Sequence, residues 1–142
     1  MKRYTSLMAI VILCVIGMMA TMPLFAQEKE WSLVGTWVNP AYENSNATPP
    51  QNIFKGDGTI TTYYHIGDSL PWGVGTYSVE SDWTEPGAHW FKVKSTFSQW
   101  TYFEIAKLTN EGNTYESVGS WDKYPSSFDK SNNSYLTRNR RE

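Results

Sequence analysis

The chain has 142 residues, a single cysteine, and 14 acidic against 12 basic residues, which give a formal charge of −2. This length suits one domain with a substantial core and is short for two. The weakly acidic balance excludes the basic surface that nucleic-acid binding requires, so no nucleic-acid partner is expected.

Residues 1–26 have the pattern of a secretory signal peptide. Lys2 and Arg3 precede an uncharged apolar run that ends in small residues, and we expect cleavage after Ala26. An uncleaved membrane anchor is the alternative, since about 18 apolar residues can span a bilayer. The pattern predicts a secreted or periplasmic protein that meets a membrane only through this segment. Residues 27–142 then form one domain without cysteine, and therefore without disulfides.

Most of the mature sequence consists of short runs rich in Thr, Val, Ile and aromatic residues, which fit pleated strands. Turn sequences such as GDG at 56–58 and NEGN at 110–113 separate the runs, and no long helical period is present. The expected strands are 32–39, 51–55, 59–66, 72–80, 89–97, 100–108, 114–122 and 133–138. The sequence thus predicts an all-β fold of about eight antiparallel strands, either a barrel or an immunoglobulin-like sandwich.

The stretch PAYENSNATPP at 40–50 is too rich in proline and asparagine for a strand. It predicts a surface loop between the first two strands. Two interpretations of this loop stay open, a lid over a binding mouth and a mobile connection without a role in binding.

The first strand contains GTW at 35–37, which places Gly35 and Trp37 on the same face because side chains alternate along a strand. Glycine leaves space beside the indole and tolerates a sharp bend in the strand. We expect Trp37 to plug the base of a barrel, where a large ring fills the interior.

These residues carry a family resemblance. GTW resembles the Gly-x-Trp signature of lipocalins and their calycin relatives, and LVGTWVNP followed by IFKGDGTITTYY is similar to bacterial lipocalin-like domains. The resemblance implies an antiparallel up-and-down barrel of about eight strands, with a terminal arginine stacked on Trp37. Arg138 is the first candidate for that arginine and Arg140 the second, since both lie on one face of the last strand. The chain has no clear central lipocalin motif, terminal helix or disulfide, so a smaller or partly open barrel stays admissible.

The resemblance implies a small apolar or amphipathic ligand inside the barrel. All seven tryptophans and eight of the nine tyrosines lie beyond residue 26, which is more aromatic surface than a single plug needs. The candidates for ligand contact are Tyr64, Trp72, Trp100 and Tyr102, which combine an apolar ring with a polar atom and come from middle strands. A plain core role is the alternative for each of them.

Two other functions are compatible with the sequence. A non-enzymatic envelope or extracellular interaction module would have a solid core and present Trp83 and Trp90 around a turn. An enzyme would use His65 or His89 as acid or base. No serine triad is evident, and a metal site would require both histidines to converge with Glu104, which nothing in their spacing demands. We therefore expect no catalytic residue, no metal and no cofactor, and the sequence does not indicate an oligomeric state.

Overall fold

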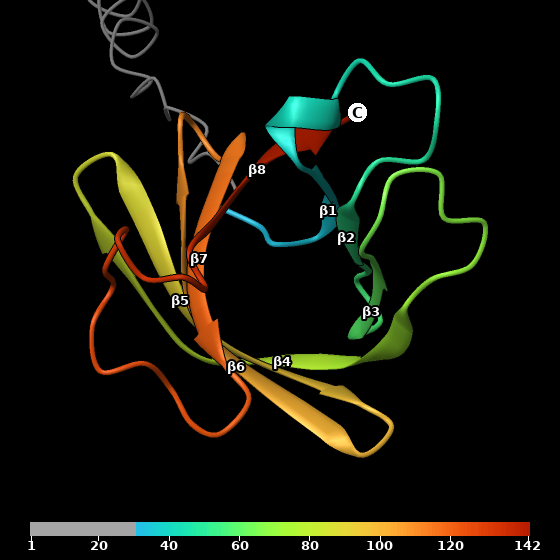
Figure 1. Cartoon of the computed structure of the whole chain (residues 1–142). Coiled ribbons are helices and arrows are strands. Elements are labelled where there is room, and N and C mark those ends of the chain that lie inside the picture. The colour runs from blue at the N-terminus through green and yellow to red at the C-terminus, as the bar shows by residue number, and fades with distance from the viewer. Residues whose placement is uncertain (1–30) are drawn as a thin grey trace, which may run out of the picture.

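The computed structural model describes residues 31–142, and the expected signal peptide lies outside the described residues. Eight antiparallel strands close a barrel in which each strand pairs with the next and the last pairs with the first (Figure 1). The strands are β1 (Gly35–Val38), β2 (Gln51–Phe54), β3 (Thr59–Tyr63), β4 (Gly73–Glu85), β5 (Ala88–Phe97), β6 (Trp100–Thr109), β7 (Thr114–Ser120) and β8 (Leu136–Arg141). The expected all-β up-and-down barrel is confirmed, and the sandwich is excluded.

Helical structure in residues 31–142 is limited to one 3-10 turn, η1 (Pro40–Tyr42), in the loop after β1. Within this described range, no helix has the length and apolarity needed to cross a membrane.

Strand β4 is longer than the sequence predicts, because it continues through the polar residues 81–85. A bulge between Val79 and Ser81 shifts the register, after which Trp83 pairs with Trp90 of β5. Gly87, with a φ of 77°, completes the tight turn into β5. Pairing with β5 therefore extends a strand whose own composition is weakly strand-like.

One end of the barrel interior is solid. Alternate side chains of the strands point inward there and form a continuous apolar cluster. Its buried members are Leu33, Trp37, Phe54, Ile60, Phe91, Val93, Ala106, Leu108 and Tyr115, together with Phe97, which extends the cluster toward the other end. Trp37 has no exposed surface, and its ring lies 5.5 Å from that of Tyr115. The indole is the plug that the sequence predicts.

The terminal arginine on Trp37 is Arg140, so the first choice of Arg138 is wrong. The Arg140 guanidinium lies 4.4 Å from the indole centroid. The register explains the difference, because Trp37 pairs directly with Arg140 across β1 and β8, whereas Arg138 pairs with Tyr115 of β7. Both arginines share one face of β8, but Arg138 lies two residues further toward the other end of the barrel.

Arg140 also explains the glycine two residues before Trp37. Gly35 has a φ of 146°, and a Cβ there would lie 2.7 Å from Arg140 Nη1. The guanidinium occupies the space that a side chain would need, and it donates hydrogen bonds to the carbonyls of Ser32 (2.6 Å), Val34 (2.8 Å) and Gly112 (3.1 Å). The arginine thereby fastens the segment before β1 to the loop between β6 and β7.

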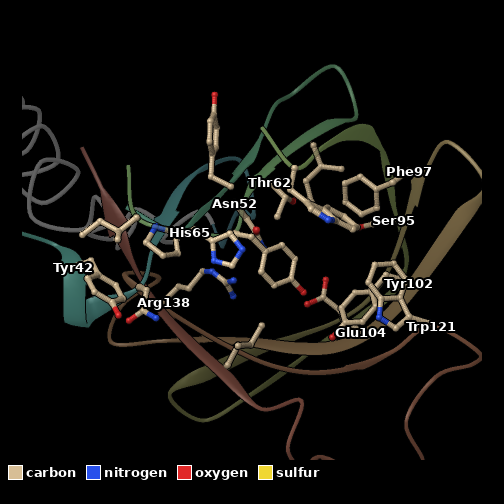
Figure 2. Close-up of a pocket in the computed structure, with 18 residues that line it drawn as sticks. Tyr42, Asn52, Thr62, His65, Ser95, Phe97, Tyr102, Glu104, Trp121 and Arg138 are labelled. Atoms are coloured by element: carbon tan, nitrogen blue, oxygen red, sulfur yellow. The ribbon is translucent and has the colours of Figure 1, made fainter. Parts of the chain in front are cut away.

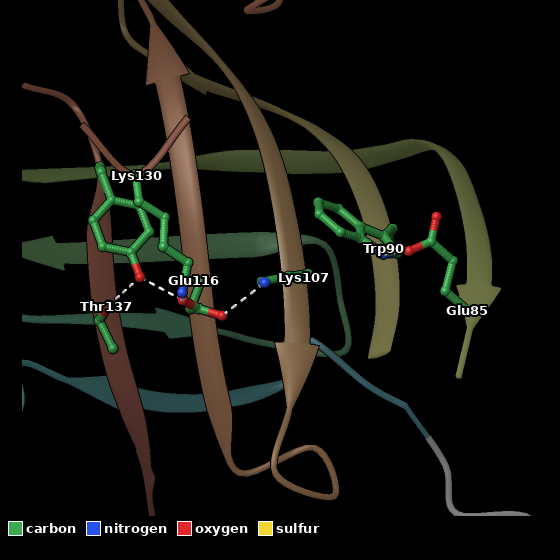
Figure 3. Close-up of polar contacts among 7 residues, drawn as sticks. Glu85, Trp90, Lys107, Glu116, Lys130 and Thr137 are labelled. Carbon is green, nitrogen blue, oxygen red and sulfur yellow. Dashed lines mark hydrogen bonds and ion pairs between the residues drawn. The ribbon is translucent and has the colours of Figure 1, made fainter. Parts of the chain in front are cut away.

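On the outer wall, Glu116 of β7 holds the long loop before β8 (Figure 3). Its carboxylate accepts hydrogen bonds from Lys130 and Tyr135 of that loop and forms an ion pair with Lys107 of β6 at 3.0 Å. Burial opposes ionisation of Glu116, but the hydrogen bonds from Lys130, Tyr135 and Lys107 outweigh it and lower its pKa to about 2. The loop therefore covers part of the outside of β6 and β7.

Candidate functional site

The other end of the barrel contains a cavity of about 420 Å³. It lies beyond Ile60, which belongs both to the apolar cluster and to the cavity wall. Strands β2, β3, β5, β6 and β8 supply lining side chains, including Asn52, Ser95, Tyr102 and Arg138, and loop residues such as Trp72 supply the rest. The volume falls in the range of small-molecule sites, which begins at roughly 300 Å³.

Polar side chains from four strands form the deep wall of the cavity. Asn52 comes from β2, Ser95 from β5, Glu104 from β6 and Arg138 from β8, and Figure 2 shows them around one interior space. Asn52 and Ser95 are only 7% and 1% exposed. The barrel interior is thus apolar at the Trp37 end and polar in its middle.

Glu104 is the buried acid of this wall. One of its oxygens, Oε1, accepts hydrogen bonds from the Tyr115 hydroxyl (3.1 Å) and the Ser117 hydroxyl (3.0 Å). Burial raises the pKa of Glu104, while Ser117, the charge of Arg138 and Tyr115 act in the opposite direction. Burial also raises the pKa of Tyr115, so its hydroxyl remains a donor.

Four buried polar atoms of the wall have no hydrogen-bond partner among the described residues. They are Asn52 Oδ1, Ser95 Oγ, and Nε and Nη1 of Arg138. Buried polar groups in folded proteins are nearly always hydrogen-bonded, and an unmade bond costs about 1–3 kcal/mol. Four such atoms in the wall of one cavity therefore lower the stability of the fold.

Aromatic side chains surround the cavity mouth. The Trp72 ring lies 5.3 Å from that of Tyr64, 5.5 Å from Phe97 and 5.9 Å from Trp121. Tyr102 in turn contacts Trp121, with ring centroids 4.6 Å apart. Polar groups therefore lie deep and apolar rings lie at the entrance.

The four predicted ligand-contact residues do not all reach the cavity. Tyr64, Trp72 and Tyr102 line it. Trp100 does not, since it is 57% exposed and forms a shallow hollow on the rim with Trp72 and Trp121. Trp100 lies at the start of β6, directly after the turn, and its ring falls outside the barrel mouth.

Sequence reasoning missed the polar wall altogether. Asn52, Ser95 and Glu104 were not ligand candidates, and Arg138 was assigned to Trp37 instead. The available signal was Glu104, an acid on the same face of its strand as Ala106 and Leu108, which are fully buried. An acid in register with core residues indicates an inward polar position.

The loop at 40–50 contributes to the cavity wall through Tyr42 and Pro50. The amide of Gly67 donates to the carbonyl of Thr48 at 2.7 Å, which connects this loop to the one between β3 and β4. Both loops stand at the same end of the barrel in Figure 1. This placement favours the lid-like interpretation over a connection without a role in binding.

The two histidines occupy different surroundings. His65 lines the cavity near its mouth, whereas His89 contacts Asp82 at 2.9 Å and Thr84 at 2.7 Å. No group of three or more His, Cys, Asp or Glu within residues 31–142 has the arrangement of a metal site. Trp83 is 38% exposed and stacks on Trp90 with ring planes 2° apart, so the two indoles are not both buried, as the interaction-module hypothesis requires.

No protein-family model, curated protein or solved structure matches the chain. The eight-stranded closed antiparallel barrel is compatible with a lipocalin-like fold. The function is therefore inferred from the geometry of the cavity itself.

Proposed function

We propose that this protein is a secreted or periplasmic, lipocalin-like barrel that binds a small amphipathic ligand in its cavity and catalyses no reaction. The Gly35, Trp37 and Arg140 arrangement supports the lipocalin-like assignment, because it joins the first and last strands as the family resemblance implies. The cavity supports the binding role. Secretion rests on the sequence pattern of residues 1–26.

The unpartnered polar atoms of the deep wall carry the proposal. A cavity needed only for packing would lower its free energy by lining the wall with apolar side chains. This wall instead keeps buried polar atoms on Asn52, Ser95 and Arg138 without protein partners. A ligand with a polar head would supply those partners, while the rings around Trp72 would bury its apolar part.

The second candidate is the interaction module, favoured by the partly exposed pair of Trp83 and Trp90 on the outer wall. Lys107 lies 5.3 Å from the Trp90 ring centroid, and Phe128 packs on the same ring at 5.0 Å. The pair is therefore integrated into the wall as well as exposed. A cavity of about 420 Å³ also departs from the solid core that this function assumes.

The test is a titration of the purified mature protein with fatty acids, retinoids and haem, followed by tryptophan fluorescence. Trp72 and Trp121 line the cavity, so a bound ligand changes their emission. Trp72→Phe should remove much of the change, and Trp83→Phe on the outer wall should preserve it. Organic extraction of the native protein with mass spectrometry provides an independent readout. Absence of both a bound ligand and any fluorescence change would contradict the proposal.

A further inference from the structure

Arg138 is the one charged side chain of the cavity that has neither an ion pair nor a hydrogen bond among the described residues. Its Nε and Nη1 are buried and unpartnered. The arginine side chain is a permanent positive charge in proteins. Arg140, two residues along the same strand, has three carbonyl acceptors and an indole. Arg140 is thus fully bonded within the protein, whereas Arg138 is free to donate hydrogen bonds to a bound molecule.

The other charged group of the wall does not satisfy Arg138. Glu104 acts on Arg138 through its charge, but no hydrogen bond or ion pair joins the two described side chains. Oε1 of Glu104 is instead committed to Tyr115 and Ser117. Burial raises the pKa of Glu104 and so opposes the ionisation that would make it a counterion for Arg138.

The remaining ionisable group, tyrosines aside, among the described residues that line the cavity is His65, at the mouth. It is an exposed residue of the loop after β3, and Figure 2 shows it on the same side of the cavity as Asn52 and Arg138. Neither Glu104 nor His65 forms a hydrogen bond or ion pair with Arg138 among the described residues, and Asn52 and Ser95 add two neutral polar groups to the wall.

We infer that the ligand is an anionic amphiphile that enters head first, with an oxyanion such as a carboxylate accepting hydrogen bonds from Arg138 and Ser95. This inference rests on the proposed function and adds the charge and orientation of the ligand. A planar guanidinium donates to oxyanions with paired N–H groups, and charge-assisted hydrogen bonds are the stronger kind. The apolar tail lies against Phe97, Trp72 and Trp121 at the mouth.

The experiment uses three amphiphiles with the same tail, decanoate, decanol and decyltrimethylammonium, below their critical micelle concentrations at neutral pH. Calorimetry or tryptophan fluorescence measures the affinity of each for the native protein, for Arg138→Gln and for Arg141→Gln. Arg141 is exposed at the end of the same strand, so its variant makes an equal change in net charge. Near-UV circular dichroism checks that each variant keeps its native packing.

Decanoate should bind the native protein about tenfold or more tightly than decanol, with decyltrimethylammonium weakest. Arg138→Gln should reduce decanoate affinity to that of decanol and leave decanol unchanged, whereas Arg141→Gln should leave both unchanged. Equal affinity for all three heads, or an unchanged preference in Arg138→Gln, overturns the head-group inference while the proposed function stands. Failure of all three to bind counts against the proposed function and the inference together.

Discussion

Arg140 lies over the indole of Trp37, and the two residues are direct partners across β8 and β1. This contact adds a side-chain link to the pairing of β1 with β8, which closes the barrel. The indole Nε1 donates to the carbonyl of Leu33 at 2.7 Å, so even its polar atom is satisfied. The polar atoms of Trp37 and Arg140 are therefore bonded within the protein, whereas Nε and Nη1 of Arg138 have no protein partner.

The two arginines should respond in opposite ways to the same substitution. Arg140→Gln removes the cation–π contact and charge-assisted hydrogen bonds, and should lower the free energy of unfolding by about 2 kcal/mol or more. Arg138→Gln removes an unpaired buried charge, and should change stability by less than about 0.5 kcal/mol or raise it. Urea unfolding measures both. Comparable losses in the two variants would contradict the assigned roles.

Gly35 should not tolerate a side chain. Gly35→Ala would place a Cβ against Arg140 Nη1 in a backbone conformation with positive φ, and should cost about 1–3 kcal/mol. Gly56→Ala is the matched control, because no atom lies within 4 Å of its Cβ position. The control should stay within about 0.5 kcal/mol of the native protein in thermal or urea unfolding. Equal effects at the two glycines would show that Arg140 does not require Gly35.

Glu116 should make the fold sensitive to acid. Its pKa of about 2 lies below its ordinary value of 4.5, so its stabilisation is present above pH 4.5 and is lost as pH falls toward 2. Glu116→Gln should cost about 1–2 kcal/mol at pH 7, since solvent near the loop screens the ion pairs, and less at pH 3. The exposed Glu142→Gln serves as control. A cost independent of pH would contradict the ionic role of Glu116.

Glu104 should have the opposite dependence on pH. Its raised pKa means that the folded state favours the protonated acid, so this contribution is present below pH 4.5 and is lost as pH rises through the folded-state pKa. Glu104→Gln keeps an oxygen to accept from Tyr115 and Ser117 and cannot ionise. The variant should therefore gain stability relative to the native protein between pH 4 and pH 7. A constant difference across this range in urea unfolding would show that Glu104 ionises without cost.

Strand positions could be predicted because turn residues and β-branched runs alternate so regularly. Seven strands lie where the composition places them, and the spacing of Gly35 and Trp37 is sufficient to predict the plug. The length of β4 could not be predicted, because residues 81–85 become a strand only through their pairing with β5. The choice between Arg138 and Arg140 depended on the register of two strands more than 90 residues apart in the chain, which local sequence does not contain.

The sequence of β6 does not reveal which face of the strand points inward, because both faces carry apolar residues. Phe103 points outward, but the loop before β8 packs on it, and the Phe103 ring lies 5.1 Å from that of Tyr124. Both faces of the strand are therefore partly apolar, and alternation does not distinguish them. The sequence alone therefore does not place Glu104 in the interior. Without that placement, the polar wall to which Glu104 belongs is not predicted either.

The most direct measurement is the backbone NMR spectrum of the labelled mature protein during titration with decanoate. Binding in the cavity should shift the amide signals of Thr62, Ser95, Glu104 and Arg138, and leave those of Trp83 and Trp90 on the outer wall unchanged. Shifts confined to the outer wall, or none in the barrel interior at saturating decanoate, would contradict the account.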